Sequence, residues 1–430
     1  MSLVTLALTG LAVLFVLMFL RMPISFAMFI VGFLGLLAVA SPRAAFNVLT
    51  ADVWNQFSSY TMSVIPLYIL MGEIVFRTGV TKSLFNAAYK WVGQFKGGMA
   101  ATVVLGSAGF AAICGSNSAT AAAMGTMALP ELKKYNYNDT LSTGTVAAGG
   151  TLGVIIPPST VLLVIALQTE QSVRELFVAS VIPGLLLTLL FLGTVFFLCQ
   201  RNPELGPDGP RVSLKEKLSS LPGFVPSLLL FAFVIGGLFL GWFTPTESGA
   251  FGAFGAMLIS LAMRKLNAEN LKAALFGTLK SSTMVITLVI GAMVFGRFLA
   301  ITRLPYEVAN WVNSLDVSPV LVLISILLIY LIGGSLMDAL GFLIISIPIF
   351  YPTIISLGYD PVWFAVVLCI VTSAGAVTPP VGVTVFVTKG LAPEIPVMSI
   401  FRGACTYLVS YAVLITLLIA FPRIITSVVR

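Results

Sequence analysis

Two short polar stretches decide the fold: Gly-Ser-Asn-Ser-Ala-Thr at residues 115–120 and Gly-Gly-Ser-Leu-Met-Asp at residues 333–338. They interrupt two long apolar segments, residues 98–132 and residues 318–350. Each segment is longer than the about 20 residues that one helical span of a bilayer needs, and too short for two full spans. We therefore predict two re-entrant helical hairpins, each of which enters and leaves the membrane on one face.

The composition of the chain indicates that its solvent is a bilayer. Of the 430 residues, 58% are hydrophobic and only 9% are charged, whereas a soluble domain carries about 25% charged residues. The mean hydropathy is +1.06. Further apolar segments of span length recur along the chain, at residues 3–20, 23–42, 59–76, 177–200, 222–241, 245–263, 282–301 and 397–422. The predicted fold class is an all-α integral membrane protein.

Composition also excludes several classes of function. The net charge of +7 is scattered through loops, with no basic stripe, so we expect no nucleic-acid partner. The chain has no histidine, and its four cysteines lie far apart in apolar segments, which supports neither a zinc site nor a disulfide framework.

Paired prolines interrupt two more apolar segments. Pro157-Pro158 divide residues 142–168, and Pro379-Pro380 divide residues 361–388. Because proline lacks the backbone donor of a helix interior and clashes with the preceding turn, we predict two discontinuous helices.

The second half of the chain repeats these features at an offset of about 220 residues. Each copy holds three spans, a hairpin that does not cross, a broken span and a final span, so the number of crossings is odd. The second copy is then inverted relative to the first, as in many secondary transporters. The predicted organisation is a first repeat at 1–200 (scaffold 1–97, hairpin and broken helix 98–200), a linker at 201–221 and a second repeat at 222–430 (scaffold 222–316, hairpin and broken helix 317–430).

This topology predicts the orientation of the chain. It places 17 of the 23 basic residues on one side and 6 on the other, and the positive-inside rule makes the first side cytoplasmic. Both termini are then periplasmic, and we read residues 3–20 as a retained span. Residues 80–95 are amphipathic and suit a helix in the cytoplasmic interface with lipids.

The four breaks are the expected binding sites. A helix that breaks inside a membrane leaves backbone groups without partners, which is tolerated only in protein or in a water-filled cavity. Freed carbonyls and hydroxyl or amide oxygens suit Na⁺, and helix N-termini suit an anion. The candidate sodium ligands lie in Gly115, Ser116, Asn117, Ser118, Gly150, Gly153, Pro157, Gly334, Ser335, Asp338, Thr372, Gly375, Thr378 and Pro379. The candidate substrate contacts are Ser118, Thr120, Ser159, Arg297, Ser335 and Thr378.

Each of these predictions has a structural alternative. Small polar residues also allow close helix packing, and Asp338, the sharpest candidate for a Na⁺ ligand, could instead cap a helix. Glu73 is expected to pair with Arg77 one turn later. Arg77 and Arg297 could simply reach the two interfaces, and Glu247 is expected to complete a capping box with Thr244.

At these residues the chain resembles the large membrane subunit of the tripartite ATP-independent periplasmic (TRAP) transporters. The resemblance covers essentially the whole chain, and its carriers are residues 115–125 (GSNSATAAAMG), 149–159 (GGTLGVIIPPS), 244–247 (TPTE) and 378–382 (TPPVG). It implies an elevator motion of the hairpins and broken helices against a scaffold, with Na⁺ as the coupling ion. It also implies import of an organic acid, such as a dicarboxylate, a sialic acid or a sulfonate.

The resemblance implies two protein partners in a bacterial or archaeal inner membrane: a small four-helix membrane subunit, expected as a separate chain, and a periplasmic substrate-binding protein. The nearest alternative is a standalone ion-coupled elevator carrier or antiporter without a binding protein. A membrane enzyme lacks the motifs it would need, and a passive channel does not explain the paired hairpins. We therefore expect no enzymatic activity.

Overall fold

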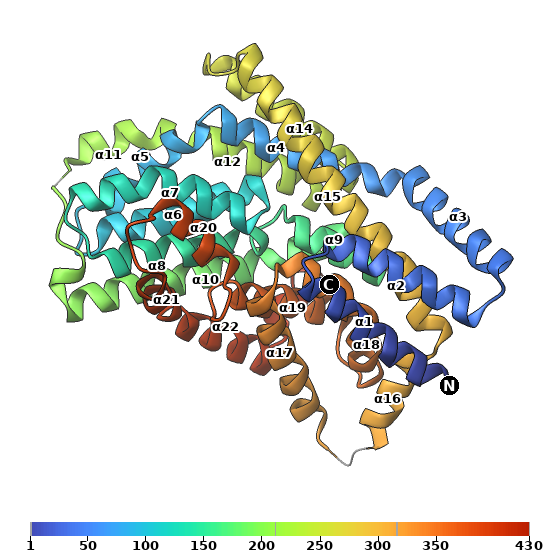
Figure 1. The fold of residues 1–430 in the computed structure, drawn as a ribbon. Helices are drawn as coiled ribbons and strands as arrows, with labels where there is room; N and C mark the ends of the chain where they lie inside the picture. The colour runs from blue at the N-terminus through green and yellow to red at the C-terminus, as the bar shows by residue number, and fades with distance from the viewer. Residues whose placement is uncertain (1, 211, 315–316, 430) are drawn as a thin grey trace.

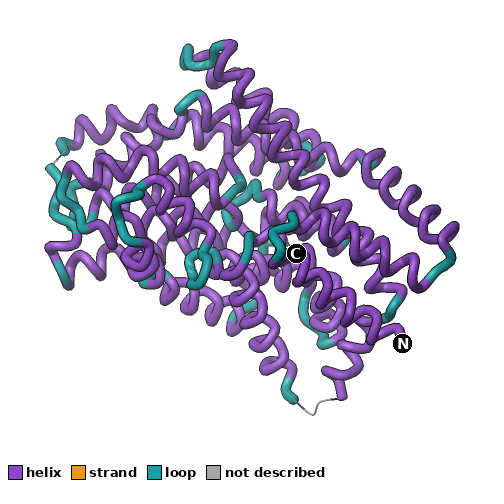
Figure 2. The backbone as a smooth tube through the Cα atoms, in the orientation of Figure 1, coloured by secondary structure: helices purple, strands orange, loops and turns teal. Residues whose placement is uncertain are grey.

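The computed structural model describes residues 2–210, 212–314 and 317–429, and these residues form helices joined by short loops, without a strand (Figures 1 and 2). The predicted boundary at 316/317 and two of the counted basic residues, Arg211 and Arg430, lie outside the described ranges. In the first half the helices are α1 (Leu3–Phe19), α2 (Ile24–Val39), α3 (Pro42–Ser58), η1 (Tyr60–Ser63), α4 (Val64–Arg77), α5 (Val80–Val92), α6 (Gly98–Cys114), α7 (Asn117–Lys134), α8 (Asp139–Gly150), η2 (Thr151–Val154), α9 (Thr160–Thr169) and α10 (Val173–Arg201).

The second half begins with short helices and continues with long ones. They are η3 (Pro203–Leu205), α11 (Leu214–Ser220), η4 (Leu221–Gly223), α12 (Val225–Phe231), η5 (Ala232–Gly236), α13 (Gly237–Phe239), α14 (Pro245–Ala262), α15 (Ala268–Ile301), α16 (Leu304–Ser314), α17 (Pro319–Leu336), α18 (Ala339–Ser356), α19 (Pro361–Gly375), α20 (Val383–Leu391), α21 (Val397–Cys405), α22 (Leu408–Ala420) and α23 (Arg423–Thr426).

By length and hydropathy, six helical segments of the described chain could cross a membrane, or seven if the bent pair 214–223 and 225–239 is one span. Both α17 and α18 are among the six, with 18 residues each. At 1.5 Å per residue each is about 27 Å long, close to the about 30 Å of a bilayer core. The apolar segment is therefore longer than the predicted residues 318–350, because α18 continues to Ser356, and by length alone each of its two helices could cross the membrane.

The helix breaks lie within the predicted stretches but are narrower. Between α6 and α7 only Gly115, with φ of +66°, and Ser116 leave the helix. Between α17 and α18 only Met337 and Asp338 do so. The broken helices part at 151–159 and 376–382, each around a cis Pro-Pro bond.

The sequence did not predict helix α3, whose residues are less apolar than those of its neighbours. Ser41 caps its first turn by accepting a hydrogen bond from the Ala44 amide at 3.3 Å, and Pro42 occupies the first helical position. A long-range ion pair attaches α3 to α15: the Arg297 Nε and Nη2 atoms donate to the two Asp52 carboxylate oxygens at 3.1 and 2.9 Å. Arg297, predicted to contact substrate, thus has a carboxylate partner within the chain.

Helices from the two halves of the sequence pack together. α2 and α4 lie along α15, and α4 also packs on α14. In a second group α8 packs on α7 and α21, and α17 packs on α19. α8 meets α21 at Gly144 and Gly403, where a Cβ on either glycine would overlap backbone of the opposite helix.

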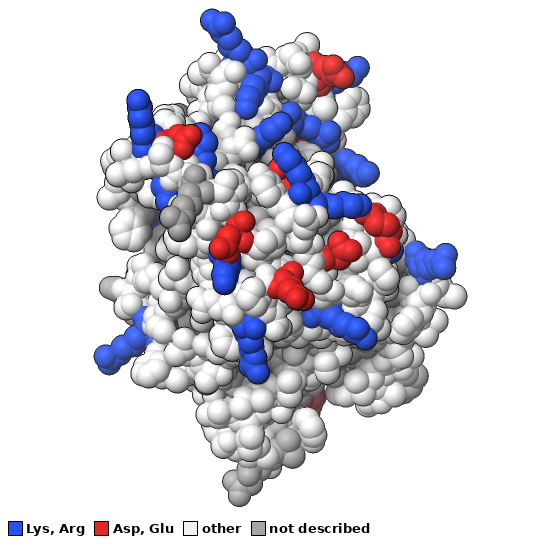
Figure 3. Space-filling model, turned by 90° about the vertical axis from the view of Figure 1, so that its left-hand side faces the viewer, with Lys and Arg blue, Asp and Glu red and all other residues white. Residues whose placement is uncertain are grey.

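Three predicted local features are present. α5 buries Leu84 and Ala88 and exposes Lys82, as expected of an amphipathic helix. Glu73 pairs with Arg77 at 3.3 Å, and Thr244 and Glu247 form the capping box of α14. Figure 3 faces the end of the molecule that carries α5 and α11, and lysine, arginine and several acids are spread over it.

Candidate functional site

The two hairpin tips meet at one cavity of about 350 Å³. Helices α4 and α15 form its opposite wall. Its lining is Ile69, Gly72, Glu73 and Phe76 of α4; Cys114, Ser116, Asn117, Ser118, Ala119 and Ala122 of the first hairpin; Val154, Thr160 and Val161 of the first broken helix; Ser281, Met284 and Val285 of α15; and Asp338, Ala339 and Leu340 of the second hairpin. The cavity thus joins segments more than 200 residues apart in sequence.

The first hairpin tip is docked on the first broken helix. The Gly115 carbonyl accepts hydrogen bonds from the Thr160 amide at 3.2 Å and from Thr160 Oγ1 at 2.7 Å. The approach requires glycine at residue 153, because a Cβ there would overlap the Ser116 carbonyl and lie 2.6 Å from Thr120 Oγ1. Glycine here lets a hairpin tip touch the backbone of the opened helix.

The second hairpin repeats this docking. The Ser335 carbonyl accepts from the amides of Val381 and Gly382 at 3.1 and 3.2 Å. A Cβ on Gly375 would lie 2.5 Å from the Gly334 carbonyl carbon, so glycine again permits the contact. Equivalent tips therefore dock on equivalent breaks in the two halves.

Because the hairpin tips are docked on the broken helices, the backbone carbonyls at the tips are not free to bind a cation. The Gly115, Ser116 and Ser335 carbonyls each accept two hydrogen bonds from the chain, which accounts for both lone pairs of each oxygen. These carbonyls were predicted to be free because the helices break beside them. The structure satisfies them instead, since the neighbouring broken helix or the next turn supplies donors.

Other buried oxygens at the breaks have no partner among the described residues. Asn117 Oδ1 accepts no hydrogen bond, and Ser373 Oγ neither accepts nor donates one. Both residues are buried: Asn117 is 6% exposed and Ser373 is not exposed at all. Leaving such a group unsatisfied costs about 1–3 kcal/mol. Amide and hydroxyl oxygens are suitable ligands for a hard cation, so the chemistry of Asn117, which lines the cavity, fits Na⁺.

The charged groups that line the cavity are both acids, Glu73 and Asp338. Asp338 Oδ2 accepts from the Leu340 amide at 3.1 Å, so this carboxylate caps α18. The capping role weighed from the sequence is therefore present, and the same side chain also borders the cavity. In the described part of the chain no three acidic or cysteine side chains form a metal-binding cluster.

The predicted site residues divide into two sets. Ser116, Asn117, Ser118 and Asp338 line the cavity together, whereas the other predicted ligands and contacts are absent from its lining. Several of those hydroxyls bond backbone of their own segment: Thr120 to Ser116, Ser159 to Val154, Thr372 to Leu368 and Thr378 to Ala374.

Some lining residues escaped the sequence analysis. Ser281 and Met284 carry no motif, and nothing in the sequence marked them. Glu73 was assigned only a structural pairing, although an acid within an apolar span is itself a signal for a site. The structure shows that Glu73 both pairs with Arg77 and borders the cavity.

Comparison with known proteins extends this description. The family described as "Tripartite ATP-independent periplasmic transporter, DctM component" matches residues 11–424. The C4-dicarboxylate TRAP transporter large permease protein DctM of Pseudomonas aeruginosa is 34% identical over 377 residues, which cover 87% of this chain and 88% of that protein. The sialic acid TRAP transporter large permease protein SiaM of Vibrio cholerae is 28% identical and covers 95% and 94% of the two chains.

A solved structure supports the fold. The Alcanivorax borkumensis YdaH transporter superposes with a TM-score of 0.60 over 88% of this chain and 89% of that one, at 15% sequence identity. The family match over nearly the whole chain and the level of identity to its relatives lead to one conclusion: this chain belongs to the DctM component family of TRAP transporters, as a large membrane permease subunit.

Proposed function

We propose that this permease imports a small organic anion, a carboxylate, a sialic acid or a sulfonate, by symport with Na⁺ through the cavity between the hairpin tips. The observation that carries the proposal is the charge of that cavity, where Glu73 and Asp338 are the charged groups of the lining. An anionic substrate beside two carboxylates is repelled by them in a medium of low dielectric constant. Bound cations remove that repulsion, which couples anion binding to Na⁺ binding.

The unpartnered Asn117 oxygen supports a Na⁺ position at the first hairpin tip. The unpartnered Ser373 hydroxyl lies near the end of α19, the first half of the second broken helix, and supports a second position there. Asp338 supplies a carboxylate oxygen at the cavity. The remaining residues of the predicted sodium set act by shaping the tips, since Gly153 and Gly375 admit the docking backbone.

The packing of the helices suggests which parts move. The hairpins and broken helices are docked on one another by the tip hydrogen bonds, whereas α2, α4, α14 and α15 pack together across the cavity. In our proposal the first group, 98–200 with 317–430, is the transport domain of an elevator. The second group is the scaffold, with both hairpins re-entrant and the second repeat inverted.

The proposal includes the partners of the complex. A small four-helix membrane subunit binds the scaffold, and a periplasmic binding protein delivers the substrate. The complex lies in the inner membrane with both termini periplasmic. The runner-up is an ion-coupled carrier that needs no binding protein.

Reconstitution tests these alternatives. The permease, with its small subunit, is placed in proteoliposomes and supplied with radiolabelled succinate, N-acetylneuraminate or isethionate under an inward gradient of Na⁺ or of choline. We expect saturable uptake of one anion that requires both Na⁺ and the binding protein. Uptake in choline would refute Na⁺ coupling, and equal uptake without the binding protein would favour the standalone carrier.

A further inference from the structure

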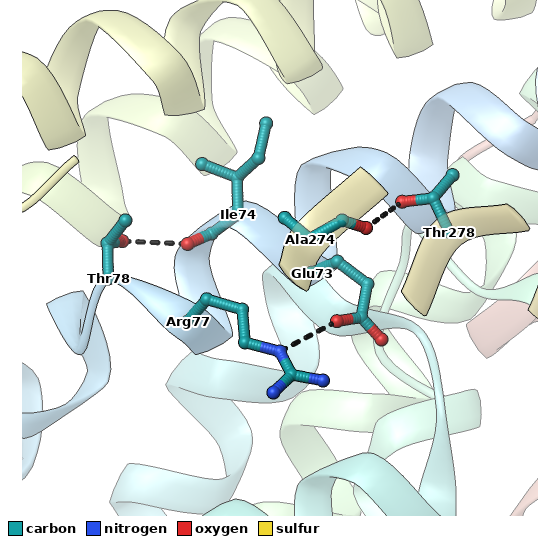
Figure 4. Close-up of polar contacts among 6 residues, drawn as sticks. All are labelled: Glu73, Ile74, Arg77, Thr78, Ala274 and Thr278. Atoms are coloured by element: carbon teal, nitrogen blue, oxygen red, sulfur yellow. Dashed lines mark hydrogen bonds and ion pairs between the residues drawn. The ribbon is translucent and has the colours of Figure 1, made fainter. Parts of the chain in front are cut away.

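Arg77 lies at the edge of the cavity and is only half engaged. Its Nε donates to Glu73 Oε2 at 3.3 Å, and its guanidinium carbon lies 5.5 Å from the centre of the Phe76 ring. Both Glu73 and Phe76 line the cavity. Figure 4 shows the Arg77 guanidinium joined to Glu73 through Nε alone, and within the described residues its terminal nitrogens donate no hydrogen bond.

The corresponding arginine of the second half is different. Arg297 uses both Nε and Nη2 to bind the two oxygens of Asp52, at 3.1 and 2.9 Å. The Nε–Nη2 edge of Arg297 is thus occupied by a carboxylate of the chain. In Arg77 only Nε is engaged, and the edge formed by the two terminal nitrogens, which can also bind two carboxylate oxygens, is unoccupied among the described residues.

The charges around the cavity suggest a role for the free terminal nitrogens of Arg77. The cavity lining carries two acids and, among the described residues, no basic side chain, and Arg77 is the cation in direct contact with that lining. We propose that Arg77 is a substrate-binding residue of the permease: its terminal nitrogens bind two oxygens of the substrate carboxylate or sulfonate, while Nε stays on Glu73. This inference rests on the proposed transport of an organic anion through the same cavity.

In this proposal Glu73 positions Arg77 but also lowers the affinity of the cavity for the anion. Its carboxylate holds the guanidinium at the cavity edge, but its negative charge also repels the incoming anion. Glutamine at position 73 would keep an oxygen acceptor for Nε and remove the charge. The two members of the pair therefore affect anion affinity in opposite directions, whereas a purely structural ion pair would be weakened alike by loss of either partner.

Binding measurements on the purified permease with its small subunit test this inference without a transport assay. Thermal stabilisation by succinate, N-acetylneuraminate and isethionate is titrated in Na⁺, for the wild type and for Arg77→Gln, Arg77→Lys, Glu73→Gln and Lys82→Gln. Lys82 is the matched control, because it is an exposed basic residue of the neighbouring helix α5 outside the cavity lining. Inorganic phosphate is included as a further ligand, to test whether the terminal nitrogens of Arg77 bind phosphate groups, such as those of lipids, rather than the organic anions.

We expect Arg77→Gln to raise the apparent Kd of the binding anion at least tenfold, and Arg77→Lys to raise it less. Glu73→Gln is expected to lower that Kd, and Lys82→Gln to have no effect. An unchanged Kd in Arg77→Gln, an unchanged or raised Kd in Glu73→Gln, or a greater effect of Arg77→Gln on phosphate than on the organic anions would overturn the inference alone. If none of the three organic anions stabilises the wild type, the proposed function fails together with it.

Discussion

Replacement of Gly375 by alanine probes the docking of the second hairpin. The new Cβ would lie 2.5 Å from the Gly334 carbonyl carbon and 2.7 Å from the Leu331 carbonyl oxygen. Carbon atoms prefer separations of about 3.5–4.0 Å, so α17 has to withdraw by about 1 Å. The obstructing atoms belong to backbone and cannot rotate away, which makes this substitution more costly than a clash with a flexible side chain.

The expected cost follows from three contributions. Overpacking costs about 1–3 kcal/mol. A 1 Å withdrawal also breaks the two bonds from the Val381 and Gly382 amides to the Ser335 carbonyl, at 3.1 and 3.2 Å, each worth about 1 kcal/mol. Alanine returns about 1 kcal/mol through its higher helix propensity. Gly375→Ala is therefore expected to destabilise the permease by about 2–4 kcal/mol.

Gly390→Ala is the matched control, because Gly390 lies in α20 of the same broken helix and nothing lies within 4 Å of its added Cβ. Thermal unfolding in detergent should show a lower Tm for Gly375→Ala and an equal or higher Tm for Gly390→Ala. Na⁺-driven uptake in proteoliposomes should be lost only in Gly375→Ala. Equal Tm and uptake in the two variants would refute the argument that this glycine is required for backbone contact.

Three further predictions concern separate parts of the molecule. Asn117→Leu should reduce the rise in Tm that Na⁺ gives by binding the folded state, because it removes an unpartnered oxygen at one of the two proposed Na⁺ positions; an undiminished Na⁺ effect would exclude this oxygen as a ligand. Tyr411→Phe should lower stability by about 1 kcal/mol, since the Tyr411 hydroxyl donates to Thr151 Oγ1 at 2.6 Å across the two halves; an unchanged Tm contradicts this. Hydrogen bonds from Ser213 lower the pKa of Glu216 in the capping box of α11, so the box is complete above the ordinary Glu pKa of about 4.3 and is lost as pH falls through the lowered value. The protection factor of the α11 amides, which corrects for the pH dependence of intrinsic exchange, should fall on that acidification and should already be low in Ser213→Ala; a protection factor that does not change with pH in the native chain would disprove the assignment.

The charge of the cavity gives the permease a physical basis for coupling. Two carboxylates favour cations and oppose anions, so a negatively charged substrate binds well only after the cavity has gained positive charge. In our proposal, Na⁺ ions at the tips and the free edge of Arg77 are two independent sources of that charge. A carrier built in this way would be prevented from moving its substrate without the ion.

The comparison of the two arginines shows where sequence reasoning is weakest. Arg77 and Arg297 occupy equivalent places in the repeat, and from the sequence Arg297 was named as a substrate contact and Arg77 was assigned to an ion pair with Glu73. Their contacts differ because α3 brings Asp52 to Arg297 from 245 residues away, whereas the acid that Arg77 pairs with among the described residues is Glu73 of its own helix. Helix α3 is less apolar than its neighbours and was not predicted from the sequence, so its Asp52 was not recognised as the partner of Arg297.

The sequence by itself determined the membrane class, the positions of the helix breaks and the capping of α14 and α18. These depend on composition or on a few neighbouring residues: glycine and proline interrupt helices locally, and Asp338 caps the turn that follows it. Only the tertiary structure decided which oxygens remain free. The Gly115 and Ser335 carbonyls are satisfied by residues at least 45 positions away, and the unpartnered Asn117 oxygen becomes evident only once all its neighbours are placed. The donors and acceptors of a segment can be read from its sequence. Their partners cannot, because they are brought close only when distant parts of the chain pack together.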